Sequence, residues 1–178
     1  AYCETAFDRA QRAKVRNITF GSSGARSVPE GFAYEAAIDQ FVSLLKQLGP
    51  LAAPRGVTVS VEQLQSRECN FINRISEVER VVRAADHPNI RGVADFYHMA
   101  AEDDTPEQLA SAADLIHHVE IAELEGRRVP GTSGQDFRPY LRELKKANYS
   151  GAIGIEGRWE LSEIEAAFDE INKQWREA

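Results

Sequence analysis

Five short apolar runs typical of buried strands alternate with helix patterns, and this alternation limits the fold more than any other feature. The strand-like runs are residues 15–20, 57–61, 90–94, 116–122 and 152–155. Strict alternation predicts an α/β fold with a parallel sheet covered by helices. A closed (β/α)₈ barrel needs about 250 residues, and this chain has 178. Two folds therefore remain, an open doubly wound sheet or the C-terminal five units of a barrel.

The helix patterns have recognisable limits. Apolar residues between 34 and 48 recur with the spacing of an amphipathic helix, and two signals, Gly49-Pro50 and Pro54-Arg55-Gly56, are predicted to mark its end. Ser76 and Glu79 have the spacing of a capping box, which predicts that another helix begins there. Further helices are predicted over residues 3–13 and 136–147, and from Thr105 and Ser162 onward.

The composition narrows the class of protein. The chain is 43% hydrophobic and 28% charged with a net charge of −7, so residues 1–178 are expected to form a single globular domain. An acidic surface repels phosphate backbones, so nucleic acid is not an expected partner. No apolar run has the length of a membrane span. Two isolated cysteines, Cys3 and Cys69, fit a reducing compartment, and we expect a cytoplasmic protein. A homo-oligomer is compatible with this composition.

Acidic residues lie at or near the ends of four successive strand-like runs. They are Glu62, Asp95, Glu120 and Glu156. Desolvating a carboxylate costs several kcal/mol unless it is paired or metal-bound. One such acid is commonly a helix cap or a loop residue, but the C-terminal ends of parallel strands gather at one edge. Four acids at that edge would repel one another, so they predict a site for a divalent cation.

Other polar residues near these acids allow both a functional and a structural interpretation. His98 follows the third strand by three residues, where it could hydrogen-bond a substrate oxygen or be a surface histidine of the loop. Glu68, in the loop after the second strand, would alone be read as a solvated charge. Arg127 and Arg128 could neutralise an anionic or polyhydroxylated ligand, or could be an ordinary surface pair.

Four stretches of this chain resemble the sugar phosphate isomerase/epimerase family, which has the xylose-isomerase-like TIM barrel and includes ketose 3-epimerases. Residues 59–73 resemble the family's fifth strand, 87–99 its sixth, 128–156 its seventh loop and eighth strand, and 21–31 a fourth-strand loop. The resemblance implies an incomplete barrel of the last five βα units, with the first three absent from this chain. Five units leave two unpaired strand edges, so we expect the natural protein to be longer.

The resemblance also implies roles for the candidate residues. The implied metal ligands are Glu62, Asp95, Glu120 and Glu156, with Glu62 and Glu156 also as catalytic acid and base, and the implied substrate contacts are Glu68, His98 and either Arg127 or Arg128. Most relatives have histidine at the seventh-strand ligand position, where this chain has Glu120. His118 shares the face of Glu120 because side chains alternate along a strand, so it is the alternative ligand.

The implied cofactor is a divalent metal ion. A set of carboxylates alone favours Mg²⁺ or Mn²⁺ over Zn²⁺, with Co²⁺ also considered. The implied activity is a metal-dependent sugar isomerase or epimerase of carbohydrate metabolism that abstracts a proton α to a carbonyl through an enediolate. An inosose-dehydratase-like lyase and a non-catalytic sugar-binding module are the alternatives. A nuclease like endonuclease IV would need a histidine-rich site, and this acidic chain has only four histidines.

Overall fold

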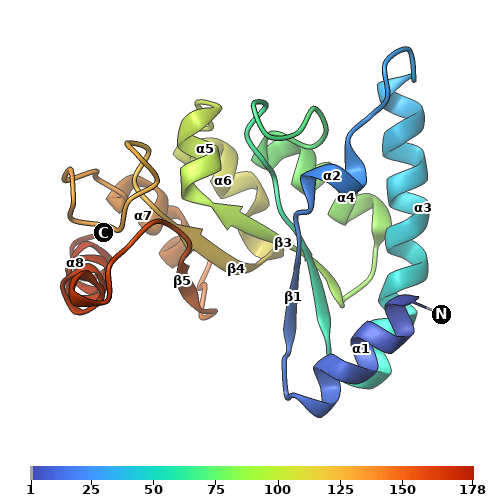
Figure 1. Cartoon of the computed structure of the whole chain (residues 1–178), viewed down its shortest axis with the longest axis horizontal. Helices are drawn as coiled ribbons and strands as arrows, with labels where there is room; N and C mark the ends of the chain where they lie inside the picture. The colour runs from blue at the N-terminus through green and yellow to red at the C-terminus, as the bar shows by residue number, and fades with distance from the viewer. Residues whose placement is uncertain (1) are drawn as a thin grey trace.

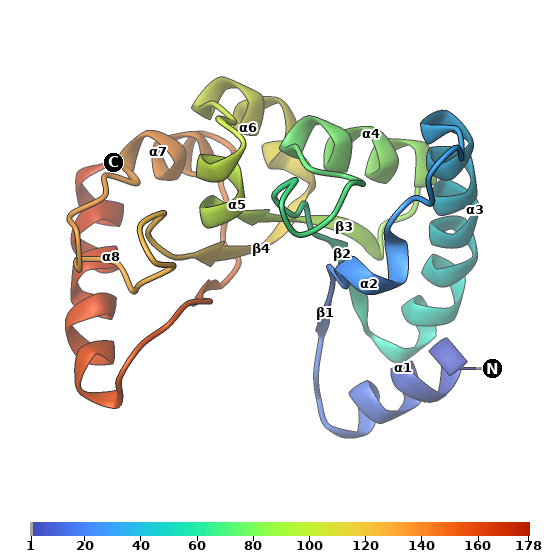
Figure 2. The ribbon, with the colours of Figure 1, turned by 45° about the horizontal axis from the view of Figure 1, so that its top comes forward.

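The computed structural model describes residues 2–178, which contain five parallel strands curled into half of a barrel (Figure 1, Figure 2). The strands are β1 (Asn17–Phe20), β2 (Thr58–Val61), β3 (Ile90–Asp95), β4 (Ile116–Ile121) and β5 (Ile153–Ile155). Their order in the sheet is their order along the chain. A doubly wound sheet reverses its strand order part-way, so the prediction of an incomplete TIM-type barrel is confirmed and the doubly wound alternative is wrong.

Helices cover the convex side of this curled sheet, as Figure 2 shows. They are α1 (Tyr2–Arg12), α2 (Ser23–Arg26), α3 (Tyr34–Ala52), α4 (Ile75–Ala85), α5 (Phe96–Ala101), α6 (Pro106–Ala112), α7 (Arg138–Lys146) and α8 (Ile164–Glu177), with short 3₁₀ turns at Ala53–Arg55, Ala113–Leu115 and Leu161–Glu163. Among residues 2–178, no helix is both long enough and apolar enough to cross a membrane.

The core lies between the convex side of the sheet and the helices. Val59, Ile90 and Val119 on the central strands are buried, together with helix residues such as Leu45 and Val78. The edge strands β1 and β5 are only half-buried along their whole length. The three central strands β2, β3 and β4 are therefore the most deeply buried part of the sheet.

Of the two predicted end signals for the helix that starts near residue 34, Gly49-Pro50 lies inside the helix, and Gly56 is the left-handed cap of the short turn that follows it. Helix α3 continues through Gly49 and Pro50 to Ala52. Proline lacks one backbone donor, but the last turn still buries Leu48 and Ala52 in the core, which favours continuation. Gly49 allows the His87 ring to pack closely against α3, because a Cβ at position 49 would lie 2.5 Å from that ring.

Helix α4 also begins differently from the prediction. Its first residue is Ile75, and the Glu77 carboxylate accepts the backbone N–H of Arg74 at 3.1 Å. Glu79, predicted to close a capping box with Ser76, instead pairs with Arg83 one turn later. The capping motif is thus present but shifted two residues toward the N-terminus, because Ile75 is fully buried and the helix must already include it.

Candidate functional site

Carboxylates from four successive strands converge at the C-terminal edge of the sheet. Glu62 and Glu156 directly follow β2 and β5, Asp95 ends β3, and Glu120 is the last but one residue of β4. One oxygen from each of the four lies within 4.8 Å of the others. These four side chains are called the carboxylate cluster below. The structure thus brings together all four predicted metal ligands.

Glu62 depends on a glycine for its position. The residue is buried, with 5% of its surface exposed, and its side chain lies against Gly21, which follows β1. A Cβ at position 21 would overlap Oε2 of Glu62. Gly21 therefore provides the space that the Glu62 carboxylate occupies.

Asp95 is fixed by the helix that it caps. Its Oδ1 accepts the backbone N–H groups of Tyr97 at 2.7 Å and His98 at 3.3 Å, so α5 begins where β3 ends. The other oxygen, Oδ2, is buried and has no hydrogen-bond partner among residues 2–178. This short helix was not predicted from the sequence, in which His98 was expected to lie in a loop.

Glu120 has one engaged oxygen and one free oxygen. Oε1 accepts a hydrogen bond from Thr19 at 3.2 Å and lies 3.5 Å from Nε2 of His118. Oε2 is buried and, with both carboxylates ionised, no described residue hydrogen-bonds it. A protonated Glu62 would share its hydrogen with the Glu120 carboxylate. Glu120, and not the alternative residue His118, belongs to the group of four close ligand atoms.

His98 is buried beneath the carboxylate cluster and is not a surface residue. Its Nδ1 accepts the backbone N–H of Gln65 at 3.1 Å, so the neutral ring carries its hydrogen on Nε2. Nε2 lies 3.5 Å from Asp95 Oδ2 and 3.9 Å from Glu62 Oε1. Burial, and then the charge of Arg127, lower the pKa of His98 to about 4, so it is neutral at pH 7.

The negative charges of the clustered carboxylates repel one another, and burial together with this repulsion raises the pKa values of the buried ones. Burial, then the charges of Glu120 and Asp95, raise the pKa of Glu62 to about 9. Burial, then Glu120, raise the pKa of Asp95 to about 7, and burial with Glu156 raises the pKa of Glu120. A divalent cation would relieve this repulsion and satisfy the two free oxygens of Asp95 and Glu120. The four carboxylates offer only oxygen donors, which fits a hard divalent cation. A second close group, Glu62, Asp95 and His98, would add one nitrogen donor.

Arg127 lies beside the carboxylate cluster. Its guanidinium stacks over the ring of Tyr97, 4.6 Å from the centroid, and pairs with Glu156. Its Nη2 is 3.6 Å from Asp95 Oδ2, and its Nη1 is 3.8 Å from Glu68 Oε1. Arg127 thus connects the cluster to Glu68.

The two other predicted substrate contacts lie in different places. Glu68 is exposed and accepts a hydrogen bond from Gln65 Nε2 at 2.8 Å, so it faces the cluster from the loop after β2. Arg128 instead pairs with Glu163, just before α8. Of the two arginines that the sequence left open, the structure brings only Arg127 to the carboxylates.

Several polar residues at this edge were not predicted from the sequence. Gln63 is fully buried, donates to the backbone oxygen of Asp95, and leaves its Oε1 without a hydrogen-bond partner in the described part of the chain. Gln65 links His98, Glu68 and Tyr97. Two glutamines alternating with apolar residues directly after a strand were a usable signal for a buried polar layer. Thr19 gave no such signal.

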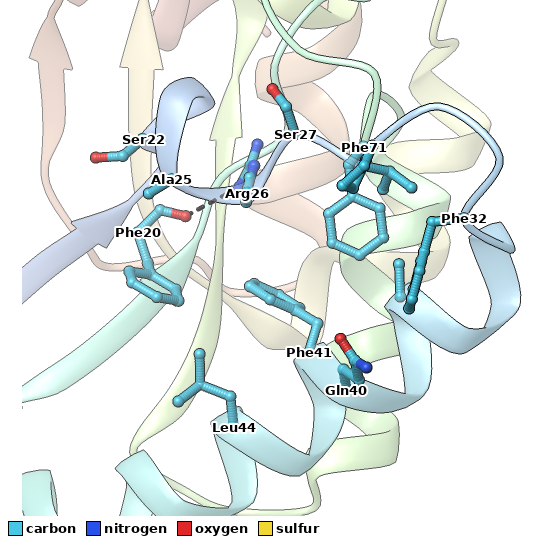
Figure 3. Close-up of a pocket in the computed structure, with 13 residues that line it drawn as sticks. Phe20, Ser22, Ala25, Arg26, Ser27, Phe32, Gln40, Phe41, Leu44 and Phe71 are labelled. Carbon is cyan, nitrogen blue, oxygen red and sulfur yellow. Dashed lines mark hydrogen bonds between the residues drawn. The ribbon is translucent and has the colours of Figure 1, made fainter.

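A pocket separate from the carboxylate cluster lies between helices near the N-terminal end of the chain. It has a volume of about 460 Å³ and is bounded by α2, α3 and the loop between them (Figure 3). Phe20, Phe41 and Phe71 line it, and Arg26 donates a hydrogen bond to the backbone oxygen of Phe20 at 3.0 Å. None of the four carboxylates lines this cavity, so it is separate from the cluster.

Comparison with known proteins identifies the family. The family model described as xylose isomerase-like TIM barrel matches residues 1–178. The chain belongs to this family. Its similarity to the sugar isomerases and epimerases named below agrees with the resemblance found in the sequence.

Among curated relatives of this xylose isomerase-like barrel, the 3-dehydro-D-guloside 4-epimerase of Escherichia coli (strain K12) is 34% identical over 115 residues. The match covers 64% of this chain and 44% of that protein. The chain spans about half the length of the curated relatives it matches.

Solved structures agree with the fold of this barrel. D-psicose 3-epimerase from Clostridium cellulolyticum H10 superposes with a TM-score of 0.87 at 19% identity, over 98% of this chain and 69% of that one. A crystal structure of the IOLI protein with a binding zinc atom gives a TM-score of 0.79 at 20% identity, over 97% of this chain and 66% of that one. At these identities the likeness shows the fold.

Proposed function

We propose that this chain carries the metal-binding carboxylates of a sugar isomerase or epimerase that removes a proton α to a carbonyl. The observation that carries the proposal is the carboxylate cluster, in which four strand-end acids lie within 4.8 Å of one another. The names of the relatives, which are sugar epimerases and isomerases, support the same class of reaction. Because the chain spans at most about half of the length of these curated relatives, the activity is proposed for the whole protein.

Glu62, Asp95, Glu120 and Glu156 would together hold one divalent cation. When bound, the cation would act as a Lewis acid that stabilises the negative charge developing on the sugar oxygens. Carboxylate ligands alone favour Mg²⁺ or Mn²⁺. The zinc in the structure of the IOLI protein makes Zn²⁺ and Co²⁺ necessary arms of any metal test.

Glu62 and Glu156 are the proposed acid and base. They follow β2 and β5, the outermost strands that contribute to the cluster. A sugar bound between them could lose a proton to one carboxylate and receive a proton from the other. General acid–base catalysis requires such groups within hydrogen-bond reach of the reacting carbon or oxygen. Their placement in one cluster supports this pairing.

Three further residues would orient the sugar. Neutral His98 presents its Nε2–H toward the cluster, where it could donate to a carbonyl or hydroxyl oxygen. Glu68 is exposed at the same edge and could accept from a hydroxyl. Arg127 lies between Glu68 and the cluster and could donate to a second oxygen.

A keto-sugar screen in D₂O tests this function. The metal-loaded native polypeptide is expected to epimerise or isomerise a sugar and to incorporate deuterium at the carbon next to the carbonyl. Loss of water from the product would instead identify a lyase, and sugar binding without turnover would identify a binding module. If Glu62→Gln and Glu156→Gln both left turnover intact, the acid–base assignment would be wrong.

A further inference from the structure

Two residues outside the carboxylate cluster converge on a single oxygen of Glu120. Thr19 belongs to β1 and donates its hydroxyl hydrogen to Oε1 at 3.2 Å. His118 lies two residues before Glu120 on β4 and brings Nε2 to 3.5 Å from the same oxygen. Strands β1 and β4 are not neighbours in the sheet. The Thr19 contact therefore crosses the inside of the curled sheet.

The inner face of β1 is polar. Ile18 and Phe20 pack with the core on the convex side, where Phe20 stacks on Phe41 of α3. Side chains alternate along a strand, so Asn17 and Thr19 point to the concave side. Inward positions of a barrel are usually filled by bulky branched apolar residues. A threonine whose hydroxyl contacts Glu120 departs from that rule in favour of a specific hydrogen bond.

The two oxygens of the Glu120 carboxylate have different surroundings. Oε1 is engaged by Thr19 and faces His118, whereas Oε2 is buried and unpartnered among the described residues. Turning the plane of the carboxylate away from Thr19 would leave the half-buried hydroxyl without its acceptor, which costs free energy. Groups behind a metal ligand commonly fix its orientation in this way.

We propose that Thr19 and His118 are positioning residues that hold Oε1 of Glu120 and thereby present Oε2 to the divalent cation. This inference rests on the proposed metal site. It assigns His118 a role behind the ligand in place of the role of ligand itself. It also makes β1, which contributes none of the four carboxylates, part of the metal site.

Metal titration of single variants tests the inference. Thr19→Val keeps the shape and removes the hydroxyl, and His118→Leu removes the second contact. Each is expected to weaken Mn²⁺ affinity by about 10–100-fold, as is common for groups behind a metal ligand. Thr19→Ser keeps the hydroxyl and is expected to retain affinity. His117→Leu is the matched control, because His117 is exposed on the opposite face of β4.

A double-mutant cycle separates positioning from general damage. If Thr19 acts through Glu120, then Thr19→Val should cause almost no further loss of affinity in a Glu120→Gln background. Thermal melts of each metal-free variant report folding, and His118→Leu probes the same oxygen if Thr19→Val folds poorly. Wild-type Mn²⁺ affinity in both Thr19→Val and His118→Leu would overturn the inference and leave the metal site standing. Absence of saturable Mn²⁺ binding by the wild type would overturn the metal site and this inference together.

Discussion

Three carboxylates of the cluster and the fourth are held in different ways. The side chains of Glu62, Asp95 and Glu120 are 7%, 1% and 11% exposed, whereas that of Glu156 is 54% exposed. The first three lie at the ends of β2, β3 and β4, each of which has a neighbour on both sides. Glu156 follows β5, the last strand of the sheet within residues 2–178, and is paired with Arg127.

This difference in burial predicts that the three buried carboxylates and Glu156 contribute to different properties of the same site. The buried three are fixed by the fold, through the space at Gly21, the cap of α5 and the contact with Thr19. They carry most of the electrostatic strain, because burial raises the pKa of each of them. We expect them to determine metal affinity, and we expect Glu156 to contribute more to turnover than to affinity.

The largest expected effect is on turnover. Glu62→Gln and Glu156→Gln should each lower kcat by about 10²–10⁴-fold, since each removes a proposed proton carrier. Only Glu62→Gln should also abolish tight Mn²⁺ binding. Glu79→Gln is the control and should change neither quantity, because Glu79 pairs with Arg83 and Ser111, which are not part of the cluster. Equal loss of Mn²⁺ affinity in both variants would break the distinction between the buried and exposed ligands.

A glycine substitution tests how strictly the buried ligands are placed. Gly21→Ala should displace the Glu62 carboxylate, because the new Cβ would occupy the position of Oε2. We expect Mn²⁺ affinity to fall by about 10–100-fold, comparable to the loss of a group that orients a ligand. Gly24→Ala is the matched control, since a Cβ at position 24 would meet no neighbouring side chain within 4 Å. Unchanged affinity in Gly21→Ala would show that Glu62 is not constrained there.

Substituting the arginines tests the exposed side of the site. Arg127→Met removes the partner of Glu156 and should raise KM for the sugar by about tenfold, the loss of roughly one charge-assisted hydrogen bond. Mn²⁺ affinity should change much less. Arg128→Met is the control, because Arg128 pairs with Glu163 away from the cluster. The assignment fails if Arg128→Met raises KM as much as Arg127→Met.

The smallest expected effect is on stability against pH. In EDTA, the pKa of Glu62 is about 9 in the folded protein against an ordinary 4.5, and that of Asp95 about 7 against 3.8. Between about pH 4 and 9 these two groups make the folded state bind more protons than the unfolded state, so they lower the free energy of unfolding as pH rises. His98, whose pKa falls to about 4 from an ordinary 6.5, opposes this trend below about pH 6.5, so the fall is expected mainly above that pH. Tm should drop by several °C between pH 5 and 9.

Two comparisons sharpen this stability prediction. Glu62→Gln should flatten the fall in Tm, whereas Glu156→Gln should leave most of it. Added Mn²⁺ should raise Tm more at pH 8 than at pH 5, because protons compete with the metal for the carboxylates. A Tm that rises with pH above about pH 6.5 in EDTA would contradict the assigned pKa shifts.

Much of the fold and part of the site could be predicted from the sequence. The five strands follow from apolar runs bounded by turns, and the strand-end acids follow from their position in those runs. The limits of α3 and α4 could not be predicted, because burial of Ala52 and Ile75 outweighs the local signals of Pro50 and Ser76.

The contacts that orient the acids could not be predicted either. Thr19 and Glu120 are 101 residues apart, and only the curl of the sheet brings them together. The short helix α5 was missed because a single capping residue, Asp95, starts it. The choice between Arg127 and Arg128 depends on the conformation of one loop, for which the sequence offered no decisive pattern.

Mn²⁺ titration of the metal-stripped protein by calorimetry or equilibrium dialysis tests the central claim most directly. The account predicts one ion per chain, binding that is lost in Asp95→Asn, and only a modest loss of affinity in Glu156→Gln. Asparagine can still cap α5, so Asp95→Asn should fold and report the ligand alone. No saturable binding by the wild type, or unchanged binding by Asp95→Asn, would contradict the account.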